Sequence, residues 1–347
     1  MARMASLFDV AKKAGVSHIT VSRVMNDKGN VAEKTKTRIL KAVEKLGYRP
    51  NAAARALSGN MARAIGIAAP ETDSVFNTRY FIELLRGVEK CCYDRSFNMV
   101  LSPRHSQGIQ ADFTSPFMER IADGVLVISP LSNDSRIFHL LKKKIPFIAV
   151  DAFLDEEIPA KYLLNFDHEG AAVLAVEHLI SSGHWRIGHV TGMMDVSAGP
   201  ARLKGYKKAL KSHGIDFDPS LVITGKFDER SGHAAGKIYV GMEKPPTAVF
   251  AGNDFTAMGV IKACQEAGWS VPGKMSVIGT DDLVIAEYSN PPLTTIRQPI
   301  FQIGFQAASR LIDLIEKKKE ASAFPPLQAE LVVRSSVKIL QGRSALT

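Results

Sequence analysis

The apolar residues of the first fifty positions recur at the three- and four-residue spacing of amphipathic helices. A first short helix is predicted after Ser6, because Ser6 and Asp9 form a Ser-x-x-Asp capping box. Gly15 supplies the turn that ends this helix, since a left-handed backbone costs least at glycine. Ser17 then caps a second helix. Its core-facing positions are Val21, Val24 and Met25. The pattern predicts a helix-turn-helix.

The outward face of the second helix is polar and partly basic. It comprises His18, Ile19, Ser22, Arg23 and Asn26, with Thr20 beside them. A third helix is predicted from Glu33 to Leu46, and Gly47 ends it. Its apolar positions include Ile39, Leu40, Val43 and Leu46. Three such helices are typical of a unit whose second helix enters a DNA groove.

The pattern changes after about residue 62, where short apolar runs begin to alternate with helical stretches. The runs cover 65–69, 98–101, 124–128 and 146–150, and then 186–190, 221–224, 247–250 and 275–279. Because they are apolar on both faces, they fit parallel strands buried between helices. The sequence therefore predicts a small all-α helix-turn-helix head, followed by an α/β body of two doubly wound lobes.

Charge is distributed unevenly along the chain. Residues 1–63 hold 13 of the 44 Lys and Arg residues and only four acids, whereas the remaining 31 basic and 31 acidic residues cancel. A basic module on a neutral body is typical of a protein that binds a polyanion such as DNA. A solvated basic tail is the alternative for a charge run. The apolar periodicity and the helix caps favour a folded module instead.

Composition and motifs exclude several other classes. The 347-residue chain has no apolar run of about 18 residues and no N-terminal signal peptide, so we expect a cytoplasmic protein. Its three cysteines, Cys91, Cys92 and Cys264, have neither metal-ligand nor disulfide-framework spacing. No G-x-G-x-x-G follows the first strand, and neither G-x-x-x-x-G-K-[ST] nor G-x-S-x-G occurs. We therefore do not expect an enzyme, and we expect neither a bound metal nor a cofactor.

Two blocks of the head resemble the lac repressor (LacI/GalR) family of bacterial regulators. They are Asp9-Val10-Ala11, Gly15-Val16-Ser17, 20–24 and Asn26, and then 46–57. The resemblance implies a DNA-binding domain over 1–50 and a hinge helix and linker over 51–61. It implies DNA contacts by Ser17, His18, Ile19, Thr20, Ser22, Arg23, Asn26, Tyr48, Asn51, Ala54, Arg55 and Leu57. Leu57 matches the leucine that wedges between base steps in the minor groove.

Two departures from the family pattern lie in the head. Ala32 stands where the family usually has a serine cap, so the third helix lacks a contact worth about 1 kcal/mol. Ile19 stands where many members place a polar or small residue, and it can offer a base edge only a contact with a thymine methyl group. The operator sequence cannot be carried over from relatives.

The body is similar to the family's effector domain, which resembles type I periplasmic sugar-binding proteins. The matching pieces include 178–179, 183–184, 201–206, 246–250, 253–254, 258–259, 271–272, 276–279, 281–282 and 292–299. The resemblance implies an effector-binding and dimerisation domain over 62–340. Its first lobe would cover about 62–163 and 296–325, and its second about 164–293 and 326–340.

The resemblance also implies an effector site in the cleft between the lobes, at the carboxyl ends of the strands. The implied ligand residues are Arg202, Asn253, Asp281, Phe227 and, less securely matched, Asp151. Thr280 replaces the usual aromatic residue, and the loop 73–81 departs from the common Asn-Pro-Phe-Phe. These departures leave the identity of the effector open.

The sequence therefore predicts a sequence-specific transcription regulator, a repressor of carbohydrate-use genes. It would bind a pseudo-palindromic double-stranded operator as a homodimer, because each recognition helix reads one half-site. A purine or other non-sugar effector within the same family is the alternative, since Phe227 could stack on a base equally well. A transport solute-binding protein or a nucleotide enzyme is a remote alternative.

Overall fold

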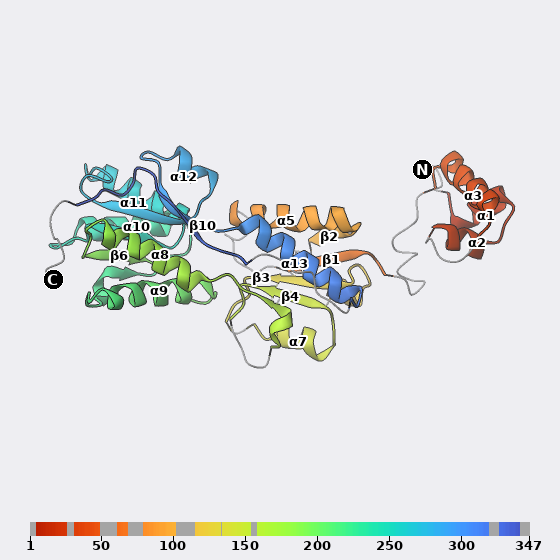
Figure 1. Ribbon diagram of the computed structural model, residues 1–347, viewed down its shortest axis with the longest axis horizontal. Coiled ribbons are helices and arrows are strands. Elements are labelled where there is room, and N and C mark those ends of the chain that lie inside the picture. Colours follow the sequence, from red (N-terminus) through yellow and green to blue (C-terminus); the bar gives the residue numbers. More distant parts are fainter. Residues whose placement is uncertain are drawn as a thin grey trace. The chain divides into compact units, whose positions relative to one another are not determined.

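The computed structural model describes residues 5–25, 31–48, 61–68, 79–101, 115–132, 134–153, 158–318 and 326–340 (Figure 1). The chain divides after Ala62 into two compact units, Met1–Ala62 and Arg63–Thr347. Each unit has its own hydrophobic core. We describe each unit separately.

The N-terminal unit contains α1 (Leu7–Ala14), α2 (His18–Met25) and α3 (Glu33–Leu46). The predicted capping box is present, because the Ser6 hydroxyl accepts the Asp9 N–H while the Asp9 carboxylate accepts the Ser6 N–H. Gly15 has the predicted left-handed backbone, with φ of 60°. Ala32 gives α3 no side-chain cap. The local chemistry read from the sequence therefore sets the helix boundaries.

The core of this unit joins all three helices. Its buried members are Val10, Ala11, Ala14, Val21, Val24, Ile39 and Ala42. Leu40, an apolar position of α3, is 48% exposed and lies outside this core. Ile39 and Ala42 point inward, so the side chain one position after Ile39 turns away from the core.

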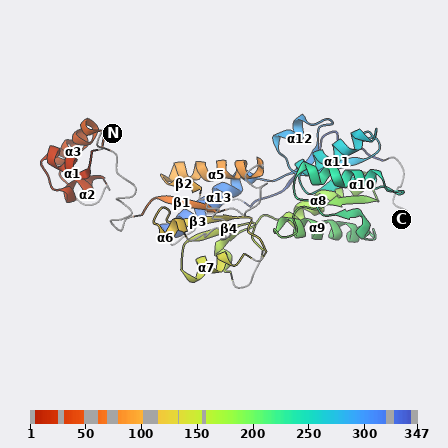
Figure 2. The same cartoon turned by 180° about the vertical axis from the view of Figure 1, so that it is seen from behind.

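The first sheet of the larger unit is parallel, with strand order β2-β1-β3-β4-β5. Its strands are β1 (Ala64–Ala68), β2 (Asn98–Leu101), β3 (Gly124–Ile128), β4 (Phe147–Val150) and β5 (Leu163–Leu164). The helices beside it are α5 (Arg79–Arg95), α6 (Ser115–Met118), α7 (Arg136–Lys142) and η1 (Ala160–Tyr162), with α13 (Ile300–Ile315) returning from far along the chain. Alternate residues of β3 and β4 belong to two separate hydrophobic clusters, one shared with α5 and α13 and the other with α7. The helices themselves can be followed in Figure 2.

Helices α5 and α13 lie side by side at an unusually short separation. A Cβ on Gly87 would lie 2.0 Å from the Phe301 carbonyl oxygen, and one on Gly304 would lie 2.0 Å from that of Leu84. Glycine at both positions is therefore what allows the two backbones to touch. This contact fixes the C-terminal helix onto the first lobe.

The second sheet has strand order β11-β10-β9-β8-β6-β7, and only β11 is antiparallel to its neighbour. Its strands are β6 (Ile187–Val190), β7 (Val222–Ile223), β8 (Ala248–Ala251), β9 (Ser276–Asp281), β10 (Thr294–Arg297) and β11 (Glu330–Val332). Helices α8 (His168–Ser181) and α9 (Ala198–Ser212) cover one face, and α10 (Glu229–Val240) and α11 (Asp254–Glu266) cover the other. The short η2 (Pro219–Leu221) and α12 (Val284–Tyr288) complete this lobe. The predicted pair of doubly wound lobes is confirmed.

The chain passes between the lobes after β5, after β10 and again between α13 and β11. The second passage lies later than expected. Ile296 and Arg297 belong to β10 and pair with Thr280 and Asp281 of β9, so the second lobe extends to Arg297. Leu164 likewise belongs to β5 of the first sheet. Within the described parts of the chain, no helix is long and apolar enough to cross a membrane.

Candidate functional site

The N-terminal unit exposes the predicted recognition face of α2. The side chains of His18, Ile19 and Arg23 are exposed, and Ile19 is 55% exposed despite being apolar. The Ser17 hydroxyl caps the helix by accepting the Thr20 N–H at 3.2 Å. Thr20 and Ser22 are half-buried, as is Tyr48, which packs against the core of the unit. The remaining predicted DNA contacts, Asn26, Asn51, Ala54, Arg55 and Leu57, lie outside the described residues, as does the hinge helix.

The larger unit contains a cavity of about 90 Å³ between its two lobes. All five predicted effector residues line it, and they come from different elements: Asp151, Arg202, Phe227, Asn253 and Asp281. The cavity wall also includes residues that the sequence did not single out. They are Tyr80, Phe81, Ile128, Ser129, His168, Met193, Val196, Ala198, Phe255 and Leu283. Ser129 directly follows β3, which is a sequence signal that could have indicated it.

Arg202 is the central polar group of the cavity and is only 3% exposed. Its guanidinium donates to the Gly252 carbonyl oxygen and lies 3.5 Å from an Asp281 carboxylate oxygen. The same group lies over the Phe227 ring, 5.3 Å from its centroid. A buried cation needs such partners, because an unpaired charge in the interior is costly. Arg202 therefore organises the second lobe's side of the cavity.

Asp281 ends β9 and sits at the floor of the cavity with a left-handed φ of 115°. One carboxylate oxygen accepts the Gln298 side-chain N–H at 2.6 Å. Burial raises the pKa of Asp281 to about 7, although Arg202 and Gln298 act to lower it. Burial also raises the pKa of the neighbouring Asp254 carboxyl well above its usual range, and the charge of Asp281 adds to that shift. Near neutral pH this region can gain or lose a proton.

Asp151, on the first lobe, is bound to the second lobe through His168. Its carboxylate accepts the Tyr80 hydroxyl at 2.9 Å and the Phe166 N–H at 2.9 Å, and it lies 3.3 Å from Nε2 of His168. Burial would raise the pKa of Asp151, but its interactions with His168, Phe166 and Tyr80 lower it overall. The Ser197 hydroxyl also donates to the Asp151 carbonyl oxygen at 2.5 Å. Asp151 thus connects the lobes, and its carboxylate is already engaged with protein groups.

Asn253 and Phe227 form one positioned pair. The Asn253 side-chain oxygen caps α11 by accepting the Thr256 N–H, and its amide donates to the Phe227 carbonyl oxygen at 2.9 Å. Phe227 has a left-handed φ of 62°, which is uncommon for an aromatic residue. Its ring lies on Gly192, where a Cβ would come within 1.7 Å of Phe227 Cζ. The geometry makes Asn253 a positioning residue for the Phe227 ring.

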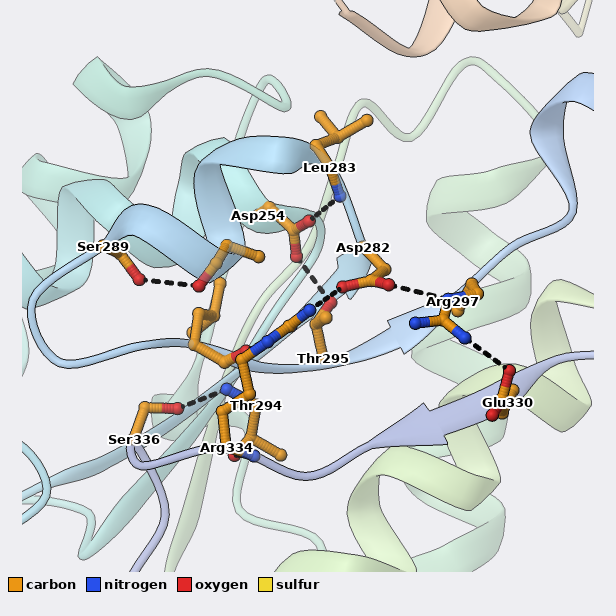
Figure 3. A network of polar contacts seen from close by, with 12 residues as sticks. Asp254, Asp282, Leu283, Ser289, Thr294, Thr295, Arg297, Glu330, Arg334 and Ser336 are labelled. Carbon is orange, nitrogen blue, oxygen red and sulfur yellow. Dashed lines mark hydrogen bonds and ion pairs between the residues drawn. The ribbon is translucent and has the colours of Figure 1, made fainter.

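A polar network around Asp254 and Asp282 joins the end of β9 to β10 and to the segment that contains β11 (Figure 3). Asp282 forms ion pairs with Arg297 of β10 and with Arg334, each at 2.7 Å. Asp254 accepts the Thr295 hydroxyl at 2.6 Å and the Leu283 N–H at 2.7 Å. Asp281 therefore lines the cavity, while the next residue, Asp282, binds Arg297 and Arg334 near the points where the chain passes between the lobes.

Comparison with known proteins identifies the family. The chain is 35% identical to the HTH-type transcriptional repressor PurR of Photobacterium profundum over 339 residues, which are 97% of this chain and 100% of that protein. It is 36% identical to the PurR repressor of Vibrio atlanticus over 341 residues, again covering 97% of this chain and 100% of that protein. The chain belongs to the LacI family. It is therefore a DNA-binding transcriptional repressor of that family, not an enzyme.

The two units of this LacI-family chain also match separately. Residues 6–51 match the bacterial regulatory proteins of the lacI family, and residues 176–337 match a periplasmic binding protein-like domain. The structure of the lac repressor dimer bound to operator and the anti-inducer ONPF superimposes with a TM-score of 0.82 at 26% identity, covering 97% of this chain and 100% of that one. A transcriptional regulator CelR–cellobiose complex gives 0.72 at 29% identity, covering 96% and 99%.

Proposed function

We propose that this chain is a cytoplasmic repressor that binds a pseudo-palindromic operator as a homodimer and responds to a small molecule in the interlobe cavity. The observation that carries the proposal is the exposed polar face of α2 on a basic helix-turn-helix unit. A single recognition helix reads one half-site, so two-fold symmetric binding needs two copies. The similar lac repressor structure, a dimer bound to operator, supports this arrangement. We assign DNA binding to 1–50, the hinge to 51–61 and effector binding to 62–340.

For the effector, we favour a planar non-sugar molecule over the carbohydrate expected from the sequence. The curated relatives described above are PurR repressors, which supports the alternative of a purine or other non-sugar effector. The Phe227 ring supplies a stacking face in the cavity. The amide of Asn253 and the carboxylate of Asp151, which a sugar would need, are engaged with protein groups. Among these residues, Arg202 and Asp281 are the polar contacts that we propose for the ligand.

We place Arg23 and His18 at base edges in the major groove, and Ser17, Thr20 and Asn26 on phosphates. The DNA-binding proposal is tested at Arg23. Arg23→Ala should cost about 1–3 kcal/mol of discrimination at one base pair. The measurement is a mobility-shift titration against operator and scrambled duplexes. Arg38→Ala removes an exposed arginine from α3 and is the control for the loss of charge alone. We expect it to lower the affinity for both duplexes equally. Equal losses on both duplexes for Arg23→Ala would assign Arg23 to the DNA backbone instead.

A further inference from the structure

The polar groups lining the cavity form one continuous chain. The Tyr80 hydroxyl donates to Asp151, Asp151 lies 3.3 Å from His168, and His168 Nδ1 lies 3.5 Å from an Arg202 nitrogen. Arg202 in turn lies 3.5 Å from Asp281. We call these five residues the polar strip. It runs from the first lobe to the second along one side of the cavity.

The rest of the described cavity wall is almost entirely carbon. It consists of Phe81, Ile128, Met193, Val196, Ala198, Phe227, Phe255 and Leu283, with Ser129 and Asn253 as its two polar members. The Asn253 amide is already bound to Thr256 and Phe227. Two of the carbon residues, Met193 and Val196, belong to the loop between β6 and α9, and a third, Ala198, is the first residue of α9. This loop therefore offers a ligand side-chain surface that cannot form hydrogen bonds.

The polar strip itself has little unused hydrogen-bonding capacity, because its members bind one another. Asp151 has both carboxylate oxygens engaged, and Asp281 uses one oxygen for both Gln298 and Arg202. What remains in the strip is the second oxygen of Asp281, together with Nε of Arg202 and Nε2 of His168, neither of which has a hydrogen-bond partner among the described residues. These atoms all belong to the strip, so a ligand can be satisfied along the single edge that faces it. Polar atoms elsewhere on the ligand would lose water without gaining a partner.

Charge and size restrict the ligand further. Asp151 and, above its pKa of about 7, Asp281 place negative charge beside the single guanidinium of the strip, so an anionic ligand would meet like charges. The cavity has a volume of about 90 Å³, which favours a small ligand over a large one. Both observations point to a compact neutral molecule.

We propose that the cavity selects a neutral single ring whose polar atoms lie along one edge, and that the loop 193–198 determines this selectivity. The polar edge of the ring lies along Arg202 and Asp281, and its remaining edges face carbon. Sugars are excluded because they carry hydroxyl groups around the whole ring, and most of these would face carbon. This inference rests on the proposed function of the cavity as the site of a planar effector.

The test compares small ring compounds by isothermal titration of the full chain, with 2-pyridone and uracil as the pair of equal ring size. 2-Pyridone has one N–H and one C=O on a single edge, whereas uracil has polar atoms around most of the ring; hypoxanthine and ribose complete the set. We expect 2-pyridone to bind about tenfold or more tightly than uracil or ribose, because the carbon wall leaves the extra polar groups unpaired. Uracil or hypoxanthine binding as tightly as 2-pyridone would overturn the single-edge inference while leaving a planar effector in place. Binding of ribose alone would overturn the planar effector as well, and failure of 2-pyridone to bind would overturn the inference.

A variant tests the role of the loop. Val196→Thr replaces one cavity-facing methyl by a hydroxyl of similar volume, so we expect the preference for 2-pyridone over uracil to fall about fivefold. Val240→Thr makes the same change at a half-buried position of α10 outside the cavity wall, and it should leave the preference unchanged. Thermal unfolding verifies that both variants fold. An unchanged preference in folded Val196→Thr would contradict the assignment of selectivity to the loop.

Discussion

Replacing Arg202 by methionine removes the guanidinium from the cavity and keeps much of the side-chain volume. The variant loses a charged hydrogen bond to the Gly252 carbonyl oxygen and the ionic contact with Asp281. The hydrogen bond alone is worth about 1.5–3 kcal/mol, because it is buried and charge-assisted. The free energy of unfolding should fall by at least that amount at any pH near neutrality.

The loss of stability caused by Arg202→Met should be larger at higher pH, because Asp281 titrates near neutrality. Its pKa is raised to about 7 in the folded protein, so the protein loses stability as pH rises from the usual carboxyl range to about 7, and the loss then levels off. Arg202 acts to lower that pKa. Without Arg202 the pKa of Asp281 lies higher, and the decline continues above pH 7. The cost of Arg202→Met should therefore be roughly 1 kcal/mol larger at pH 8 than at pH 6.

The assay is urea unfolding of the full chain, followed by circular dichroism at pH 6 and pH 8. In an Asp281→Asn background the pH-dependent part should vanish, since no proton can then be gained at that site. Arg186→Met is the matched control, because Arg186 pairs with Asp218 where both side chains are more than a third exposed. Its cost should stay below about 1 kcal/mol and show no increase between the two pH values. An equal cost of Arg202→Met at both pH values, or an increase that persists in Asp281→Asn, would refute the reasoning.

Three further predictions concern separate parts of the chain. In the N-terminal unit, Ser6→Ala should lower the free energy of unfolding by about 1 kcal/mol, because it removes a helix cap, and Ala32→Ser should raise it by a similar amount, because it adds one. Thermal unfolding measures both changes. A more stable Ser6→Ala or a less stable Ala32→Ser would contradict the cap assignments. Gly192→Ala should displace the Phe227 ring and weaken effector binding, measured by calorimetry, while leaving operator affinity unchanged. Normal effector binding by this variant would show that Phe227 does not contact the ligand. Leu57→Ala should weaken specific operator binding, measured by mobility shift, without changing effector binding. Unchanged operator affinity would contradict the hypothesis that Leu57 inserts between base steps.

The sequence predicted most of the local structure, because local structure depends on neighbouring residues. The capping box at Ser6 and the left-handed turn at Gly15 follow from a few adjacent side chains, and both are present. The sequence identified Leu40 as an apolar position of α3 but did not predict that its side chain is exposed. Direction depends on where α1 and α2 pack, and no local pattern contains that information.

The cavity was predicted only in part, for a similar reason. Resemblance identified five residues that the fold does bring to one cavity, but not the roles of their side chains. The Asn253 amide is used to hold Phe227, and the Asp151 carboxylate is used to bind Tyr80, Phe166 and His168. These contacts join segments far apart in the sequence. His168 carried no signal by itself, because it becomes part of the cavity only through its contact with Asp151.

The central claim is that this LacI-family chain recognises a specific, two-fold symmetric operator. The most direct test selects bound sequences from a random duplex library with the purified full chain at physiological salt. The account predicts enrichment of an inverted repeat with half-sites about 10 base pairs apart, bound by two copies of the chain. Bound sequences without a shared repeat, or equal affinity for the enriched and the starting DNA, would contradict it.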